Sequence, residues 1–416
     1  MMTSLVSLVL AASLDGATIA PPTPDTVAAR REDLSFLVKT LPEKHPNAFA
    51  KRTREHFLAD ATSLDERLAA MNDDEFLIEL SSLVASLGDG HTSLGKPLGR
   101  YPLQIGFFAD GPRVLVAPES SRDALGGEVI AIGETPIDEA MRRLARVEAI
   151  ETETTLLAKA RHLIVAPEVL HGLQLAGPRT ALFVVACRDG ERRGLSLDAL
   201  RNSSQVAWAT LPPGGDMLRM RDAKRGALLA EIDGGRGLYL AYRKCAIDPQ
   251  APIGELMKTL LERIDRETPP RVVIDLRSNG GGNSAILSEW IPKLAERSAK
   301  RERGWLAVLI DRHTFSSAMM NAWQLKRDAR AVLYGEPTGG AKNHFGEVRS
   351  FDLPKSGLKV HHSTRLFKLD GDAPGPVAPD VRVDETFDNY LAGRDATLEA
   401  ALAGPPPAPP GPPPAR

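Results

Sequence analysis

The spacing of apolar side chains divides the chain into three regions with different predicted secondary structure. In the first region apolar residues recur every three or four positions, as at Leu34, Leu37 and Leu41. This spacing is typical of helices that pack through one face. The pattern ends at the turn sequence Gly88-Asp89-Gly90. We therefore expect a helical N-terminal domain over residues 25–95.

The second region contains short segments rich in branched and aromatic residues. Arg113 to Ala117, Val129 to Ile132 and Leu182 to Cys187 are predicted strands. Ile137 to Val147 is a predicted helix between the last two of them. The pattern indicates a small β-rich domain over residues 96–205.

In the third region, residues 225–402, predicted strands and helices alternate. The strands are Gly237 to Tyr242, Arg271 to Leu276 and Leu306 to Asp311, and the helices are Pro252 to Arg266, Ser284 to Leu294 and Ser317 to Arg327. Alternation of this kind is typical of βαβ units in an α/β layer. The fold class predicted for this region is therefore α/β.

Composition fits a globular protein with more than one domain. The chain has 416 residues, of which 43% are hydrophobic and 25% charged, and a length of this order favours two or three domains. The formal net charge is −2. Proteins that bind nucleic acids or anionic membranes usually present a basic face, so neither is an expected partner.

The cysteine pattern indicates neither a disulfide scaffold nor a metal centre. Cys187 and Cys245 are the two cysteines of the chain. They could form one disulfide, or they could be two buried thiols that pack as small apolar residues. No cluster of cysteines and histidines has the spacing of a zinc site, so we expect no structural metal.

Both ends of the chain differ from a folded core. The apolar run Leu5 to Leu14 is followed by small residues and Pro21-Pro22, which resembles a secretory signal within residues 1–24 and predicts export. A simple N-terminal extension is the alternative. The run is shorter than the ~20 residues that a spanning helix needs, so we expect no integral membrane segment. Residues 403–416 are mostly proline and predict an extended tail.

The stretch Val272 to Asn283 passes from an apolar strand into a turn with three consecutive glycines, Gly280, Gly281 and Gly282. Glycines allow positive φ and leave backbone N–H groups uncovered. Beside the start of a helix, such groups can bind an anion or the oxyanion of a tetrahedral intermediate. A purely structural tight turn is the alternative.

A second passage from strand to helix contains Ser316. A serine at the N-terminus of the predicted helix Ser317 to Arg327 is well placed as a nucleophile, because the helix dipole stabilises developing negative charge. The alternative is an N-cap, a position at which serine is among the favoured residues.

His91 lies in the glycine-rich loop between the helical and β-rich regions. A histidine can act as base and then as acid near neutral pH, because its unperturbed pKa is about 6.5. A loop position predicts that the ring is reachable from a cleft. The alternative is a solvated loop histidine without a role.

Five segments together resemble the tail-specific or C-terminal processing serine peptidases, in particular the branch of the tricorn protease and the interphotoreceptor retinoid-binding protein. They are Gly88 to Thr92, Asp275 to Gly282, Thr314 to Ala318, Gly335 to Gly340, and Val377 to Asp380 with Gly393 to Asp395. The resemblance covers roughly residues 85–400.

This resemblance implies a crotonase-like ββα core, an N-terminal helical domain and a PDZ-like β-rich domain. It also implies a peptidase in which Ser316 attacks the peptide carbonyl and His91 is the general base. The backbone N–H groups of Gly281 and Ser317 would form the oxyanion hole. No cofactor is implied, and the partner is a peptide or unfolded protein substrate.

The PDZ-like domain is carried by Gly126 to Ile137, which resembles the family's peptide-binding module. Such a module binds an extended chain by adding it as a strand at the sheet edge. A purely structural β domain is the alternative. The oligomeric state is left open by the sequence.

Several positions depart from the family pattern. Ala373 stands where the tricorn-like branch has a glutamate, with Asp372 beside it, and Met319 stands where the family often has an acid. The lysine used as base in the other branch corresponds to Lys342, one place late. His344 is a further residue that could approach a substrate. These departures leave open an alternative function, a weak or inactive family member that binds a peptide or apolar ligand.

Overall fold

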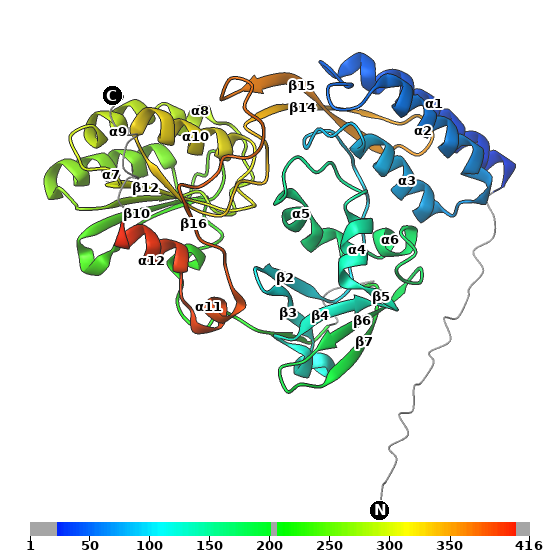
Figure 1. Ribbon diagram of the computed structural model, residues 1–416, viewed down its shortest axis with the longest axis horizontal. Coiled ribbons are helices and arrows are strands. Elements are labelled where there is room, and N and C mark those ends of the chain that lie inside the picture. Colours follow the sequence, from blue (N-terminus) through cyan, green and yellow to red (C-terminus); the bar gives the residue numbers. More distant parts are fainter. Residues whose placement is uncertain (1–22, 201–205, 405–416) are drawn as a thin grey trace, which may run out of the picture.

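The computed structural model describes residues 23–200 and 206–404. The predicted secretory segment, apart from its last residues, and nearly all of the proline-rich tail lie outside these ranges. Figure 1 shows an α/β core, a group of N-terminal helices and a β-rich region arranged around the middle of the molecule.

The N-terminal region is helical, as its apolar spacing predicts. It consists of α1 (Pro24–Lys44), α2 (Arg54–Arg67), the short 3-10 helix η1 (Leu68–Ala70) and α3 (Asp73–Ala85). Asn72 begins α3 with a capping box, in which its side chain accepts from the Glu75 N–H and the Glu75 carboxylate accepts from the Asn72 N–H. The helices pack through fully buried residues such as Leu37, Phe57 and Leu80.

A long hairpin connects the core with these helices. Its strands are β14 (Asn343–Asp352) and β15 (Lys359–Lys368), and β15 pairs with β1 (Ser93–Leu94) in antiparallel fashion. Leu353 and Val360 of the hairpin are buried in the hydrophobic cluster of the N-terminal helices. In Figure 1 the hairpin, in orange, reaches from the core to the N-terminal helices, where Asp33 of α1 accepts from the N–H groups of Lys355 and Ser356 at its tip. It therefore packs with the N-terminal helices although its sequence falls within residues 225–402.

The β-rich region forms one mainly antiparallel sheet with three helices against it. Its elements are β2 (Gln104–Phe108), β3 (Gly111–Pro118), η2 (Glu119–Ala124), β4 (Glu128–Ile132), β5 (Thr135–Pro136), α4 (Ile137–Leu144), α5 (Thr155–Leu163), α6 (Pro167–Gly172), β6 (Thr180–Ala186), β7 (Arg192–Asp198) and β8 (Trp208–Thr210). The main strand order is β2-β3-β4-β6-β7, so β2 is an edge strand.

The third region is an α/β layer, as predicted. Its elements are η4 (Leu218–Met220), β9 (Ala227–Ile232), η5 (Asp233–Gly235), β10 (Gly237–Tyr242), α7 (Ile253–Glu267), β11 (Val272–Asp275), α8 (Ala285–Ser288), α9 (Ile291–Ser298), β12 (Leu306–Ile310), α10 (Ser317–Ala329), β13 (Val332–Gly335), β16 (Val381–Arg382), α11 (Phe387–Ala392) and α12 (Ala396–Ala403). The strand order is β16-β13-β12-β11-β10-β9, and every pair is parallel except β9 with β10.

One predicted helix of this layer is wrong. The segment Ser284 to Leu294 forms two helices, α8 and α9, and Trp290 lies between them. Pro292 stands in the first turn of α9, where its missing N–H costs no intrahelical bond. A proline that starts a new helix explains the break.

Apolar packing covers both faces of the core sheet. Strands β10 to β13 are buried at every position, as is typical of parallel strands with helices on both sides. Ile274 packs with Leu287 and Leu325 on the face of α7 to α10. On the other face Val273 packs with Ala401 of α12. The carboxyl ends of these strands are thereby held in one row.

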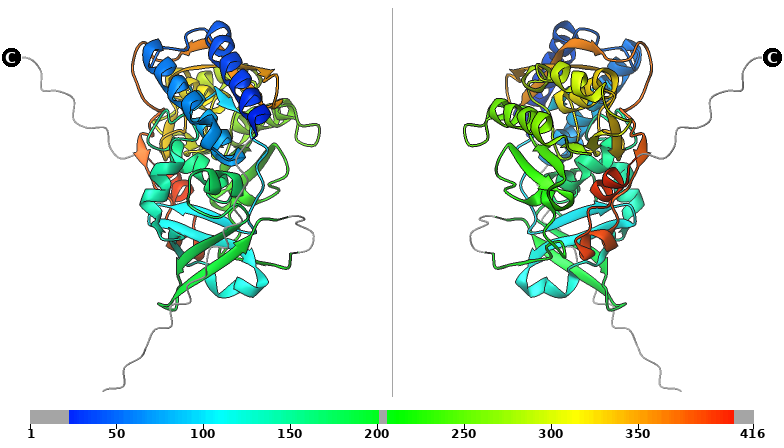
Figure 2. Two further views of the ribbon diagram at one scale, coloured as in Figure 1. Left: turned by 90° about the vertical axis from the view of Figure 1, so that its right-hand side faces the viewer. Right: turned by 90° about the vertical axis from the view of Figure 1, so that its left-hand side faces the viewer.

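The C-terminal segment also joins the core to the β-rich region. Phe387 and Tyr390 of α11 pack their rings on Phe108 of β2. The side views in Figure 2 show α11, in red, next to the strands of the β-rich region.

Both cysteines are free and buried, which confirms the interpretation of Cys187 and Cys245 as packed thiols. Among residues 23–200 and 206–404, the helices include none that is long and apolar enough to cross a membrane.

Candidate active site

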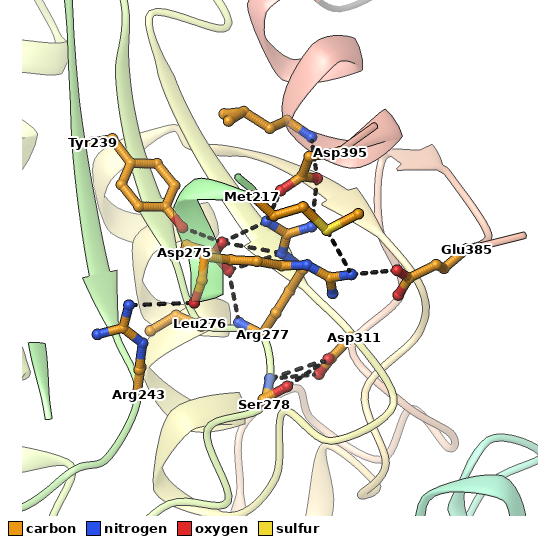
Figure 3. Close-up of polar contacts among 12 residues, drawn as sticks. Met217, Tyr239, Arg243, Asp275, Leu276, Arg277, Ser278, Asp311, Glu385 and Asp395 are labelled. Atoms are coloured by element: carbon orange, nitrogen blue, oxygen red, sulfur yellow. Dashed lines mark hydrogen bonds and ion pairs between the residues drawn. The ribbon is translucent and has the colours of Figure 1, made fainter. Parts of the chain in front are cut away.

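A buried ionic network holds the start of the glycine turn in place (Figure 3). Arg277 forms paired bonds with Asp275, the shortest at 2.6 Å, and two bonds of 2.7 Å with Asp395. The Tyr239 hydroxyl donates to Asp275 at 2.6 Å. Burial would raise the pKa of Asp395, but the Arg277 charge outweighs it and lowers this pKa to about 2. These motif residues therefore tie the C-terminal segment to the core.

Asn279 holds the glycine turn against the segment that carries Ser316. Its side chain is fully buried and donates to the Tyr242 carbonyl at 2.7 Å. The side-chain oxygen of Asn279 accepts from the Gly281 N–H at 2.9 Å. Its backbone carbonyl accepts from the Phe315 N–H at 3.0 Å. One asparagine thus sets the distance between the two turns.

Asp311 organises the turn that precedes Ser316. Its carboxylate accepts from the N–H groups of Ser278, His313 and Thr314, each at 2.9 Å. The Thr314 hydroxyl donates to the Leu276 carbonyl at 2.9 Å. The turns after β11 and β12 are therefore cross-linked by side chains, and the position of Ser316 follows from them.

Ser316 has an unusual backbone conformation for a non-glycine residue. It precedes α10 with φ 51° and ψ −125°, and its side chain makes no capping hydrogen bond to the described helix. A serine N-cap has an extended backbone and accepts from an amide of the first turn. Ser316 therefore occupies the N-cap position, but its side chain does not cap the helix. A strained residue of this kind is typical of functional sites.

Gly281 lies directly against Ser316. A Cβ on Gly281 would be 2.8 Å from the Ser316 Cβ and 3.0 Å from the Ser317 nitrogen, and its φ is +103°. Only glycine fits both the space and the backbone. The structure therefore brings the glycine turn and the start of α10 into contact, as the sequence predicts.

The two predicted oxyanion donors differ in availability. The Gly281 N–H is engaged by Asn279, as described above. The Ser317 N–H belongs to the first turn of α10, where amides have no partner within the helix. The Ser317 hydroxyl donates to the Gly282 carbonyl at 2.7 Å and holds the glycine turn.

The ring of His91 stacks between two other rings near Ser316. Its centroid is 4.6 Å from that of Phe315 and 5.4 Å from that of His344. Both ring nitrogens are buried and have no hydrogen-bond partner in the described part of the chain. His91 is half-buried, and Phe315 and His344 cover the faces of its ring.

Burial changes the acid–base behaviour of His91. Desolvation, followed by the charge of His344, lowers the pKa of His91 to about 4. The Asp89 carboxylate opposes this shift, and Lys159 adds to it. His91 is therefore neutral at pH 7, the state that can accept a proton.

Asp89 holds the His91 loop in place. It accepts from the His45 ring at 3.0 Å, from the hydroxyls of Thr92 and Ser363 at 2.5 and 2.6 Å, and from the His91 N–H at 3.0 Å. Burial would raise the pKa of Asp89, but these hydrogen bonds, led by that of His45, lower it to about 2. The loop is thereby fixed to α1 and to the hairpin.

The other candidates from the sequence lie away from Ser316 or are neutralised. Lys342 forms an ion pair of 2.8 Å with Asp370, so its ammonium group is engaged away from Ser316. The Asp372 side chain is 92% exposed and pairs with Lys368. The segment around Ala373 therefore supplies no carboxylate to His91.

Two residues near His91 were given little or no role by the sequence. His344 stacks on His91, and Glu151 has a buried side chain that accepts from the Gly90 N–H at 3.0 Å. His344 was noted only for its place in the loop. Glu151 stands just before α5, where an acidic residue is ordinary, so no sequence signal marks it.

The structure thus places a strained serine at the N-terminus of α10, beside a glycine turn, and the preceding Phe315 stacks on His91. A serine at a helix N-terminus near a histidine is an arrangement found in serine hydrolases. The sequence model of peptidase family S41 matches residues 291–383, which include Ser316. This match confirms the resemblance to the processing peptidases.

Solved structures extend the comparison to most of the chain. The mature form of CPAF superposes with a TM-score of 0.63 at 14% identity, covering 90% of this chain and 96% of that one. The photosystem II D1 C-terminal processing protease has a TM-score of 0.40 at 14% identity, with 89% and 98% covered. The likeness to CPAF shows a shared fold. The TM-score of the D1 processing protease is too low to support a conclusion on the fold. None of the curated proteins compared matches this sequence.

Proposed function

We propose that this chain is a serine peptidase that hydrolyses peptide bonds through an acyl-enzyme on Ser316. In this proposal the Ser316 hydroxyl attacks the carbonyl while His91 takes its proton and then returns it to the leaving amine. The Ser317 N–H and the glycine turn stabilise the oxyanion. A crotonase-like core and a PDZ-like region are part of the same proposal.

The backbone of Ser316 is the observation that carries this proposal. Ser316 has a strained backbone with φ 51°, and the adjacent Gly281 has no room for a Cβ. Strain of this kind lowers stability and is typical of functional positions. The hydroxyl of Ser316 makes no capping bond, so helix stability does not account for the residue. A role as a nucleophile at the positive N-terminus of α10 accounts for this serine.

Catalysis requires one rearrangement from the conformation described. The Phe315 ring stacks on His91 at an interplanar angle of 24°, and the nitrogens of His91 have no partner among the described residues. We propose that the His91 ring or the Ser316 side chain turns so that a ring nitrogen accepts from the Ser316 hydroxyl. Such bonds are often absent in ligand-free enzymes and form with substrate.

The proposed route for the substrate runs along the edge strand β2. A cavity of about 530 Å³ is lined by β2 residues such as Phe107 and by Ser278, which lies three residues before Gly281. An extended peptide can add to a free strand edge through backbone hydrogen bonds. This geometry supports delivery of an unfolded chain from β2 to the glycine turn.

The test is turnover of a fluorogenic unfolded protein, such as dye-labelled casein, by wild-type chain and variants. Ser316→Ala and His91→Gln are expected to lose cleavage by at least ~100-fold. Ser350→Ala changes an exposed serine of β14 and is expected to cleave as wild type. Equal turnover by wild type and Ser316→Ala would refute the proposal.

A second function, peptide binding without hydrolysis, is favoured by a different observation. The Gly281 N–H is already bonded to Asn279, and no carboxylate comes from the segment of Ala373 in the described structure. An inactive relative would bind extended peptides with no product over hours. Fluorescence anisotropy of a dye-labelled unstructured peptide separates the two functions. Both raise the anisotropy on binding, but only the peptidase lowers it again by cleavage.

A further inference from the structure

Glu151 is a buried carboxylate to which the proposed mechanism gives no role. Its side chain is 1% exposed, and its nearest cation, the Lys51 ammonium, lies 3.8 Å from one carboxylate oxygen. The Lys51 side chain is itself 45% exposed. A buried charge without a short ion pair is costly, so such a group is retained for a reason.

The carboxylate of Glu151 joins two loops that meet at the site. One oxygen accepts from the Gly90 N–H at 3.0 Å and the other from the Ala341 N–H at 3.4 Å. Gly90 directly precedes His91, and Ala341 lies three residues before His344. A Cβ on Gly90 would be 2.8 Å from the Glu151 carboxyl carbon, so glycine is required for this approach.

The residues that follow Glu151 strengthen the same connection. The hydroxyl of Thr154 donates to the Thr338 carbonyl at 2.9 Å, and that of Thr155 donates to the Gly339 carbonyl at 2.6 Å. The segment before α5 therefore holds the loop between β13 and β14 by several bonds, and Glu151 is the charged member of this set.

We propose that Glu151 is a positioning residue of the hydrolytic centre, which holds the His91 loop against the loop that leads into β14 and keeps a negative charge beside His344, the ring that stacks on His91. This inference rests on the proposed function. It supplies, from the segment before α5, the carboxylate that the segment of Ala373 does not provide.

Asp89 acts on the His91 ring directly, because its charge raises the pKa of His91 against the effect of burial. Its two oxygens accept from four donors, which leaves little free acceptor capacity. Glu151 has two amide partners and no short ion pair. Its charge raises the pKa of His344 against the larger effect of burial.

The charged and titratable groups around the two imidazoles come from four segments. They are Asp89 on the His91 loop, Lys51 after α1, Glu151 just before α5 with Lys159 in that helix, and His344 on β14. Glu148 forms an ion pair of 3.2 Å with Lys159. Removing the Glu151 charge leaves the imidazolium form of His344 less stabilised, so the stacked pair of His91 and His344 takes up its first proton at a lower pH.

The test is the rate of labelling by a serine-reactive fluorophosphonate as a function of pH, in the full chain. Glu151→Gln is expected to label more slowly than wild type and to shift the acid limb of the profile down by about half to one pH unit. Glu153→Gln, an exposed neighbour with 72% side-chain exposure, is expected to leave rate and profile unchanged. Lys51→Met removes the nearest cation and is expected to shift the acid limb up.

The outcomes separate this inference from the proposed function. A wild-type chain that is not labelled refutes the proposed function itself. Labelling of wild type together with an unshifted acid limb in Glu151→Gln overturns the inference alone, whether or not the rate falls, because a mere brace would not change the pH dependence. If Glu151→Gln does not fold, the surface variant Lys51→Met decides, and an unshifted limb there overturns the inference.

Discussion

The contact between Gly281 and Ser316 predicts that one added methyl group disables the site. In Gly281→Ala the new Cβ would meet the Ser316 Cβ at 2.8 Å and the Phe315 carbonyl oxygen at 3.0 Å. These neighbours are backbone or directly attached to it, so the turn or the serine must shift. The required φ of +103° is also unfavourable for alanine.

The magnitude follows from these two effects. An L-residue at strongly positive φ costs about 1–2 kcal/mol, and an extra methyl group in a filled space costs about 1–3 kcal/mol. We therefore expect a loss of about 2–5 kcal/mol in the free energy of unfolding. A displacement of the nucleophile on the order of 1 Å lowers reaction rates by about 100-fold.

The neighbouring glycine provides a matched control. A Cβ on Gly280 would have no heavy atom within 4 Å, and Gly280 does not have a positive φ. Gly280→Ala is expected to change stability by less than about 0.5 kcal/mol and to label at the wild-type rate. Urea denaturation and fluorophosphonate labelling of both variants measure the difference. Similar behaviour of the two variants would refute the packing described for Gly281.

Three further perturbations test the scaffold and the base. Asp395→Ala leaves the buried Arg277 with one acid fewer and is expected to lower the free energy of unfolding in urea by about 3 kcal/mol. Asp384→Ala, in an exposed ion pair, is expected to lower it by less than about 0.5 kcal/mol. Equal losses would contradict the network. Because the pKa of His91 is about 4 when folded and 6.5 when unfolded, the unfolded state binds the proton first and stability falls as pH drops through this window, by about 2 kcal/mol from pH 7 to 5. His91→Gln removes this part of the pH dependence, and an unchanged slope would show that the ring is not buried. Asp89→Asn presents an amide to hydroxyl and amide donors and is expected to cost about 1–3 kcal/mol, measured by thermal unfolding; a neutral effect would contradict the contacts described for this loop.

The core and its turns could be predicted because their signals are local. The apolar run of leucine and tyrosine predicted β10 with the same bounds as in the structure, Gly237–Tyr242. The predicted helix after Ser316 begins at Ser317, as α10 does. Parallel strands align their carboxyl ends at one edge of a sheet. The approach of the glycine turn to the start of α10 follows from this alignment.

The remaining features depend on contacts between distant parts of the chain. The hairpin β14–β15 pairs with β1 across more than half of the sequence, and no periodicity reveals such a partner. The ring of His91 is covered by Phe315 and His344 only because three loops converge. Glu151 resembles an ordinary acidic residue before a helix until the fold buries it against Gly90. Local patterns carry no information on these pairings.

The most direct test of the account identifies the residue that reacts. The full chain is treated with a fluorophosphonate, digested, and analysed by mass spectrometry, alongside the serine-to-alanine variant at position 316. We predict one modified peptide, with the phosphonyl group on the residue that precedes α10, and no modification of the variant. A label on any other serine, or an unreactive wild-type chain, would contradict the assignment of a nucleophile to this strained position.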